Sequence, residues 1–95
     1  MKCNSKVRCY VTVTDSMKEQ LKDNGLKPGY YNSTYYGYPE VYMSEELALN
    51  HRSPKDAVMV ELELEADSVV GTYPSGVLLL VREIYPDNIV EFREL

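Results

Sequence analysis

The sequence of 95 residues predicts one small α+β domain. Near the N-terminus an alternating apolar–polar stretch leads directly into a segment with helical spacing, which indicates a strand followed by a helix. The C-terminal 40% of the chain instead carries short apolar stretches separated by turn residues, a pattern typical of strands. We therefore expect a small mixed or antiparallel sheet with one longer N-terminal helix and one short helix, in a single domain spanning residues 1–95.

The first strand and helix are predicted over the first quarter of the chain. Apolar and polar residues alternate over residues 7–14, as in a half-buried strand. Ser16 and Glu19 have the spacing of a capping box, which predicts that Ser16 caps the helix. Leu21 contributes to an apolar stripe, and Gly25 supplies the conformation that commonly ends a helix.

The middle of the chain combines a tyrosine-rich segment with a short helix. Residues 30–42 hold six of the nine tyrosines, and we expect a long loop that ends in a short strand over residues 41–43. A short helix is expected over residues 44–51. Ser44 would be its N-cap, and His51 would lie at its C-terminal, negative end.

Strands dominate the predicted C-terminal region. Residues 57–65 alternate strictly between apolar and mostly acidic residues, and residues 67–76 are expected to be loop apart from a short extended piece. Residues 77–81 are uniformly apolar, which favours a central strand that is covered on both faces. A turn at residues 86–88 then leads into a last strand at residues 89–93.

Composition and charge exclude several classes of function. The net charge of −5 disfavours nucleic-acid binding, and no apolar run is long enough to span a membrane. The N-terminal residues lack the apolar block of a signal peptide. Cys3 and Cys9 are too few for a disulfide framework, and they have no partner pair for a zinc site. We therefore expect a cytoplasmic protein with no metal centre.

Four short motifs occur along the chain: VTVTD at residues 11–15, NGLKPG at 24–29, EVYMSEELALNH at 40–51 and IYPDNI at 84–89. Together they resemble the histidine–tyrosine–glutamate class of ADP-ribosyltransferases, and the resemblance covers roughly residues 10–92. In that class a strand, a helix and a glycine–leucine–proline turn open the fold. A strand tyrosine followed by a helix comes next.

The resemblance implies a damaged catalytic set. Thr12 stands at the family's histidine position, Tyr42 at the nicotinamide-stacking tyrosine and Val77 at the catalytic glutamate. Threonine is too short to replace the histidine, and valine cannot stabilise a developing positive charge. NAD or ADP-ribose could still bind at Thr12 and Tyr42, with Arg8, which lies on the same strand face, meeting a phosphate.

These side chains also have purely structural explanations. Thr12 suits the polar face of a strand, and Tyr42 could pack in the core. Arg8 could be a surface cation, and His51 could simply interact with the helix dipole. The three glutamates of the alternating segment, Glu61, Glu63 and Glu65, suit a solvated strand face.

The tyrosine-rich segment predicts a binding surface. Six tyrosines within thirteen residues cannot all be buried in a domain this small, and exposed aromatic clusters usually mark contact sites. We expect Tyr35, Tyr36 and Tyr38 to form an interface. No lysine or arginine lies between Pro28 and His51, which favours a protein or an uncharged nucleoside portion over nucleic acid.

The sequence therefore predicts a catalytically deficient ADP-ribosyltransferase-like binding protein. It would act as an inhibitor or adaptor, for example one encoded by a phage, by binding a protein or an NAD- or ADP-ribose-type nucleotide. One alternative is an active transferase in which Glu83 or Glu91 replaces the missing glutamate. Another is a small protein-interaction module that is unrelated to the family.

Overall fold

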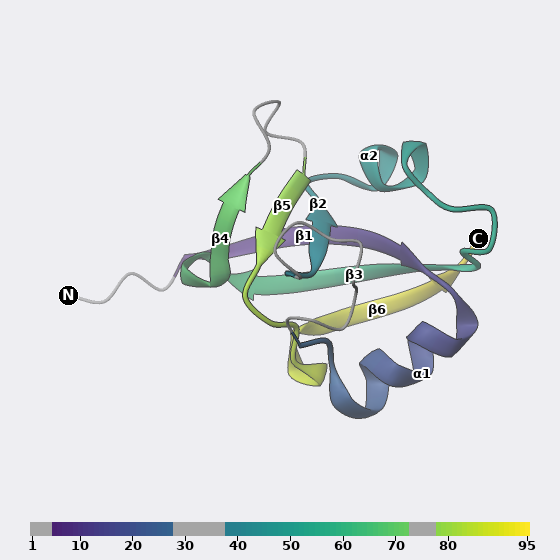
Figure 1. Ribbon diagram of the computed structural model, residues 1–95, viewed down its shortest axis with the longest axis horizontal. Helices are drawn as coiled ribbons and strands as arrows, with labels where there is room; N and C mark the ends of the chain where they lie inside the picture. The colour runs from purple at the N-terminus through teal and green to yellow at the C-terminus, as the bar shows by residue number, and fades with distance from the viewer. Residues whose placement is uncertain (1–4, 28–37, 73–77) are drawn as a thin grey trace.

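A six-stranded sheet forms the centre of the computed structural model, which describes residues 5–27, 38–72 and 78–95 (Figure 1). Every pair of neighbouring strands is antiparallel, so the α+β prediction is confirmed and the sheet is antiparallel rather than mixed. In order across the sheet, the strands are β4 (Val69–Thr72), β5 (Leu78–Val81), β2 (Glu40–Tyr42), β1 (Lys6–Val13), β3 (Val58–Glu65) and β6 (Ile89–Glu94).

Two α-helices lie on either side of the strands, as Figure 1 shows: α1 (Asp15–Asn24) below them and α2 (Glu45–Asn50) above them. Single turns of 3-10 helix lead into the two edge strands, η2 (Ala66–Ser68) before β4 and η3 (Pro86–Asn88) before β6. In the described parts of the chain, neither helix is long and apolar enough to cross a membrane.

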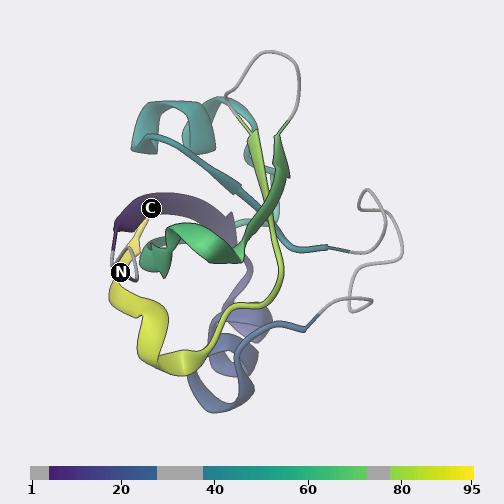
Figure 2. The same ribbon diagram turned by 90° about the vertical axis from the view of Figure 1, so that its left-hand side faces the viewer.

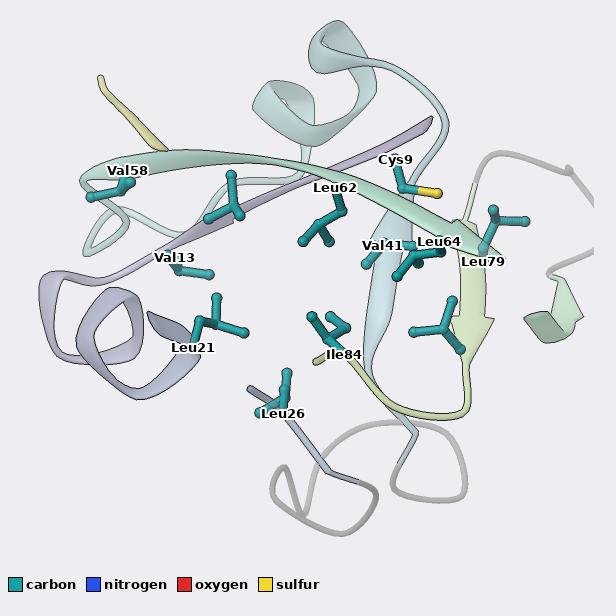
Figure 3. Packing of buried hydrophobic residues seen from close by; sticks show 12 residues of the cluster. Cys9, Val13, Leu21, Leu26, Val41, Val58, Leu62, Leu64, Leu79 and Ile84 are labelled. Atoms are coloured by element: carbon teal, nitrogen blue, oxygen red, sulfur yellow. The ribbon is translucent and has the colours of Figure 1, made fainter. Parts of the chain in front are cut away.

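The core lies on the α1 side of the sheet. In β1 the apolar residues face β3 partners of the same kind, as in the pairs Cys9↔Leu62 and Val13↔Val58. Leu21 of α1 is fully buried against this surface (Figure 3). The strict alternation in both strands explains this arrangement, because successive strand side chains point to opposite faces. The other buried members of the cluster are Leu26, Val41, Val60, Leu64, Leu79, Val81 and Ile84.

Helix α1 begins earlier than the capping-box prediction placed it. Thr14, not Ser16, is the N-cap, and its Oγ1 accepts a hydrogen bond of 3.1 Å from the amide of Met17. The predicted cap at Ser16 was wrong because the strand passes into the helix through Thr14 alone, which leaves Ser16 within the first turn. Met17 and Leu21 of this helix pack against the core. By contrast, Ser44 caps α2 as predicted.

The C-terminal strands differ from the prediction in two respects. The short extended piece expected within residues 67–76 is longer than predicted and forms a strand of the sheet, β4, which pairs with β5. The described part of the apolar strand, Leu78–Val81, is buried throughout as expected, but it lies second from the edge rather than at the centre. Uniform burial therefore indicates that both faces of the strand are covered, and it does not fix the place of the strand in the sheet order.

Gly25 joins the end of α1 to the segment that follows β5. Its backbone has φ 73° and ψ −155°, a region that essentially only glycine adopts. A Cβ at this position would collide with the carbonyl oxygen of Ile84. The next residue, Leu26, exchanges two backbone hydrogen bonds with Ile84, of 2.7 and 2.8 Å. The NGLKPG and IYPDNI motifs are therefore in direct contact.

We expect Gly25→Ala to lower the free energy of unfolding by about 2 kcal/mol or more, because alanine adds backbone strain and meets the Ile84 carbonyl. Gly71→Ala is the matched control. An added Cβ there would meet the Leu80 side chain at 3.6 Å, an ordinary contact, so we expect a change within about 0.5 kcal/mol. Urea unfolding of both variants measures the difference, and equal effects would contradict this role for Gly25.

Candidate functional site

The sheet face opposite the core carries the residues that the sequence predicted to bind a ligand. Arg8, Tyr10 and Thr12 alternate along β1 with the core residues, so all three lie on this face. Tyr42 of β2 lies directly opposite Tyr10. Helix α2 packs against β1 and β2 on this side (Figure 2). We call this surface the polar face, and it brings Arg8, Thr12 and Tyr42 onto two neighbouring strands.

Two carboxylates of β3 hold the guanidinium of Arg8. One terminal nitrogen donates to Glu63, which lies directly opposite, at 2.7 Å, and the other donates to Glu61. The hydrogen bonds to Glu63 and Glu61 raise the pKa of Arg8 above its ordinary value. Lys6 lies 3.9 Å from Glu63 and 4.0 Å from Glu65. Along this part of the polar face, three carboxylates therefore surround two cations.

Thr12 is bound to a residue that the sequence analysis did not single out. Its hydroxyl donates a 2.7 Å hydrogen bond to Asp56, whose same oxygen accepts the Ser53 amide at 3.0 Å. This carboxylate ties β1 to the turn between α2 and β3. Ser53-Pro54 is a turn signal in the sequence. The contact of this turn with β1 depends on the tertiary structure, because Thr12 and Asp56 are 44 positions apart.

Tyr42 stacks on His51. The two ring centroids are 5.0 Å apart and the rings are inclined by 14°. The imidazole Nδ1 lies 2.9 Å from the carbonyl oxygen of Leu47. Since a carbonyl can only accept, Nδ1 carries the proton. His51 is the C-cap of α2, in agreement with the structural explanation of this residue, and it covers part of the Tyr42 ring.

Several predicted site residues lie outside the described residues. Tyr35 and Tyr36 of the expected interface are among them, and so is Val77, at the family's glutamate position. Tyr38 is described and is half-buried, next to the buried Pro39. In sequence, position 77 directly precedes Leu78, which lies opposite Tyr42 across the β2–β5 pair.

Neither alternative catalytic glutamate lies beside Tyr42. Glu91 is on β6, three strands away from β2 in the sheet, which corresponds to about 14 Å at ordinary strand spacing. Glu83 comes after the C-terminal end of β5, whereas Tyr42 pairs with Leu78 at the N-terminal end of that strand. The sheet therefore separates both carboxylates from the stacked tyrosine.

The described residues include no group suited to bind a metal ion and no reactive thiol. Within residues 5–27, 38–72 and 78–95, no group of three or more histidine, cysteine or acidic side chains is arranged to hold a metal ion. Cys9 is a free thiol that lies in the core, and burial raises its pKa to about 11. Because the thiolate is the nucleophilic form, Cys9 is unsuited to covalent chemistry at neutral pH.

No protein-family model, curated protein or solved structure matches this chain. The family resemblance therefore remains a proposal that depends on the four motifs.

We expect Thr12→Val to lower the free energy of unfolding by about 1 kcal/mol, because it removes the hydroxyl that donates to Asp56 and leaves the shape of the side chain almost unchanged. Combined with Asp56→Ala in a double-mutant cycle, the two changes should be less than additive by about 0.5 kcal/mol or more. Thr72→Val, at an exposed position of β4, is the control and should change stability by less than about 0.5 kcal/mol. Strict additivity would show that the Thr12–Asp56 hydrogen bond does not contribute to stability.

Proposed function

We propose that this protein is a catalytically deficient, ADP-ribosyltransferase-like binding protein that acts on another protein as an inhibitor or adaptor. One observation carries the proposal. The three side chains that would receive a nucleotide all have partners within the chain: Arg8 contacts Glu61 and Glu63, Thr12 contacts Asp56, and Tyr42 stacks on His51. A bound nucleotide would have to displace several of these contacts at once.

The charges around Arg8 argue for a protein ligand over NAD or ADP-ribose. A pyrophosphate group needs uncompensated positive charge or free amide donors. Here the guanidinium is neutralised by Glu61 and Glu63, and Glu65 adds further negative charge near Lys6. A phosphate approaching this part of the polar face would meet net negative charge, which also disfavours nucleic acid.

The positions of the motifs support the transferase-like scaffold. Thr12 lies on β1 and Tyr42 on β2, and position 77 directly precedes β5 in sequence. These are three adjacent strands of the sheet. The other two motifs meet through the hydrogen bonds between Leu26 and Ile84. A chance set of four short matches would not be expected to converge in this way.

The lost catalytic group supports a function that does not involve turnover. Valine at position 77 cannot stabilise an oxocarbenium ion, and the substitute carboxylates Glu83 and Glu91 are both remote from Tyr42. The same chain retains the tyrosine-rich segment before β2, and tyrosines supply large, rigid contact areas. Binding through that segment, with Tyr35, Tyr36 and Tyr38 as its contacts, is therefore the proposed activity.

We expect the purified protein to show no NAD hydrolysis and no self-modification above a buffer control. NAD and ADP-ribose, each at about 1 mM, should leave the melting temperature unchanged, because a ligand stabilises only a protein that it binds. Isotope-labelled NAD and thermal unfolding measure these quantities. Turnover that is lost in Glu83→Gln or Glu91→Gln would refute the proposal in favour of an active transferase.

We expect the triple variant Tyr35→Ser, Tyr36→Ser, Tyr38→Ser to keep its melting temperature and to lose the proteins that the immobilised wild type captures from an extract of the native host. Two hot-spot residues, each worth about 2 kcal/mol, would weaken binding about a thousandfold.

Tyr85→Ser is the matched control for this triple variant. Tyr85 is 56% exposed and follows β5 in sequence, so it does not belong to the tyrosine-rich segment of residues 30–42. It should capture the same proteins as the wild type. Unchanged capture by the triple variant at an unchanged melting temperature would show that the binding surface lies elsewhere. A large drop in its melting temperature would show that these tyrosines belong to the core.

A further inference from the structure

Strand β6 forms one edge of the sheet and pairs on one side only within the described residues (Figure 1). It is six residues long, and three apolar side chains along this edge keep much of their surface in solvent: Val90 is 50% exposed, Leu95 is 46% exposed and Phe92 is partly exposed. The other edge strand, β4, is less suited to pairing with a further strand, because it has four residues, one of them a glycine, and a shift in register. Edge strands with free backbone groups are templates for a further strand.

The backbone of β6 offers its free groups in a defined pattern. The backbone amide of Leu95 donates to the carbonyl oxygen of Ala57 at 2.9 Å, so the backbone groups of Leu95 point inward, towards β3. Because successive residues of a strand point their backbone groups to opposite sides, Arg93 and Glu91 also point inward. The N–H and C=O groups of Phe92 and Glu94 therefore point out from the sheet, where a new strand would bind.

The charges on β6 match those of a second copy of the same strand. In an antiparallel pair centred on Phe92, Glu91 of one copy lies directly opposite Arg93 of the other, and the converse pair forms by symmetry. Within one chain, Arg93 Nε already lies 3.3 Å from Glu91, and Arg93 also contacts Glu45 of α2. Charged residues usually protect an edge strand from pairing. Here their signs alternate about the centre, so the antiparallel arrangement sets opposite charges, and not like charges, directly across from each other.

Phe92 would meet its own copy at the centre of this pair. Its side chain lies on the core side of the sheet, opposite Val60, with the ammonium group of Lys18 5.5 Å from the ring centroid. Two such rings facing each other across neighbouring strands would cover their remaining exposed surface. A parallel arrangement would instead place Glu91 opposite Glu91, which is unfavourable.

We infer that β6 is a self-association edge at which two copies of the chain join their sheets in antiparallel fashion about Phe92. The interface follows the twofold symmetry of most homodimers, in which the same surface serves both subunits. It is short, so the dimer is weak and reversible. This inference is independent of the proposed function.

Charge reversal tests the pairing directly. Sedimentation equilibrium between about 1 µM and about 1 mM should show a monomer–dimer equilibrium for the wild type. Glu91→Arg and Arg93→Glu each place two like-charged pairs in the dimer, and each should raise the dissociation constant at least about tenfold. The double variant Glu91→Arg, Arg93→Glu restores opposite signs across the interface and should return the constant to within about threefold of the wild type.

Two further variants keep the test decisive if a charge reversal unfolds the chain. Glu94→Pro removes an outward N–H that the isolated domain does not use, and proline is tolerated on the solvent side of edge strands, so it should weaken the dimer without lowering the melting temperature. Val70→Lys on β4 is the control and should leave the dissociation constant unchanged. A wild type that stays monomeric up to about 1 mM would overturn the inference. A double variant as weak as the single ones, or a dimer that only Val70→Lys disrupts, would overturn it as well.

Discussion

The register between β1 and β3 is the constraint on which the rest of the structure depends. Eight consecutive pairs, from Lys6↔Glu65 to Val13↔Val58, fix the two longest strands to each other. Because side chains alternate, this register places the alternating valine, leucine and cysteine residues of both strands on the α1 side, whereas Met59, opposite Thr12, is buried on the polar face. A slip of one residue would turn this entire set towards the polar face and expose it, so the hydrophobic pattern specifies the register strongly. Leu21 of α1 can then bury itself completely against a continuous apolar surface.

The same register decides the chemistry of the polar face. It sets Arg8 opposite Glu63 and next to Glu61, so the guanidinium proposed as a phosphate contact is paired within the chain. Exposed ion pairs of this kind contribute little to stability because water screens them. Their main effect is on what the surface can bind, because the available positive charge is already compensated. The strand pairing that builds the core thus also compensates the charge of Arg8 on the polar face, so that this side chain does not attract an anion.

The closure of the domain depends on residues that are remote in sequence. Gly25 allows the chain to leave α1 within contact distance of Ile84, and Leu26 completes a short antiparallel bridge there. Asp56 similarly joins the turn after α2 to Thr12 of β1. Gly25 ends a helix and Asp56 lies in a turn, which are local roles. Each residue also contacts a segment that is distant in sequence. These links hold α1 and the α2 turn to opposite faces of one sheet.

The sequence by itself determined the class of the fold and most of its elements, because alternation, helix stops and turn residues act over a few neighbouring positions. It identified β1, β3 and β6 closely, the cap at Ser44 and the burial of residues 78–81. It placed the start of α1 wrongly, since Ser16 and Thr14 are both acceptable cap residues and the chain uses Thr14. Tertiary structure alone decided the strand order, the second-from-edge place of β5 and the partners of Arg8, Thr12 and Tyr42. Those features depend on residues that are far apart in sequence, 55 positions in the case of Arg8 and Glu63. No local pattern encodes which of several distant carboxylates or rings a side chain will meet.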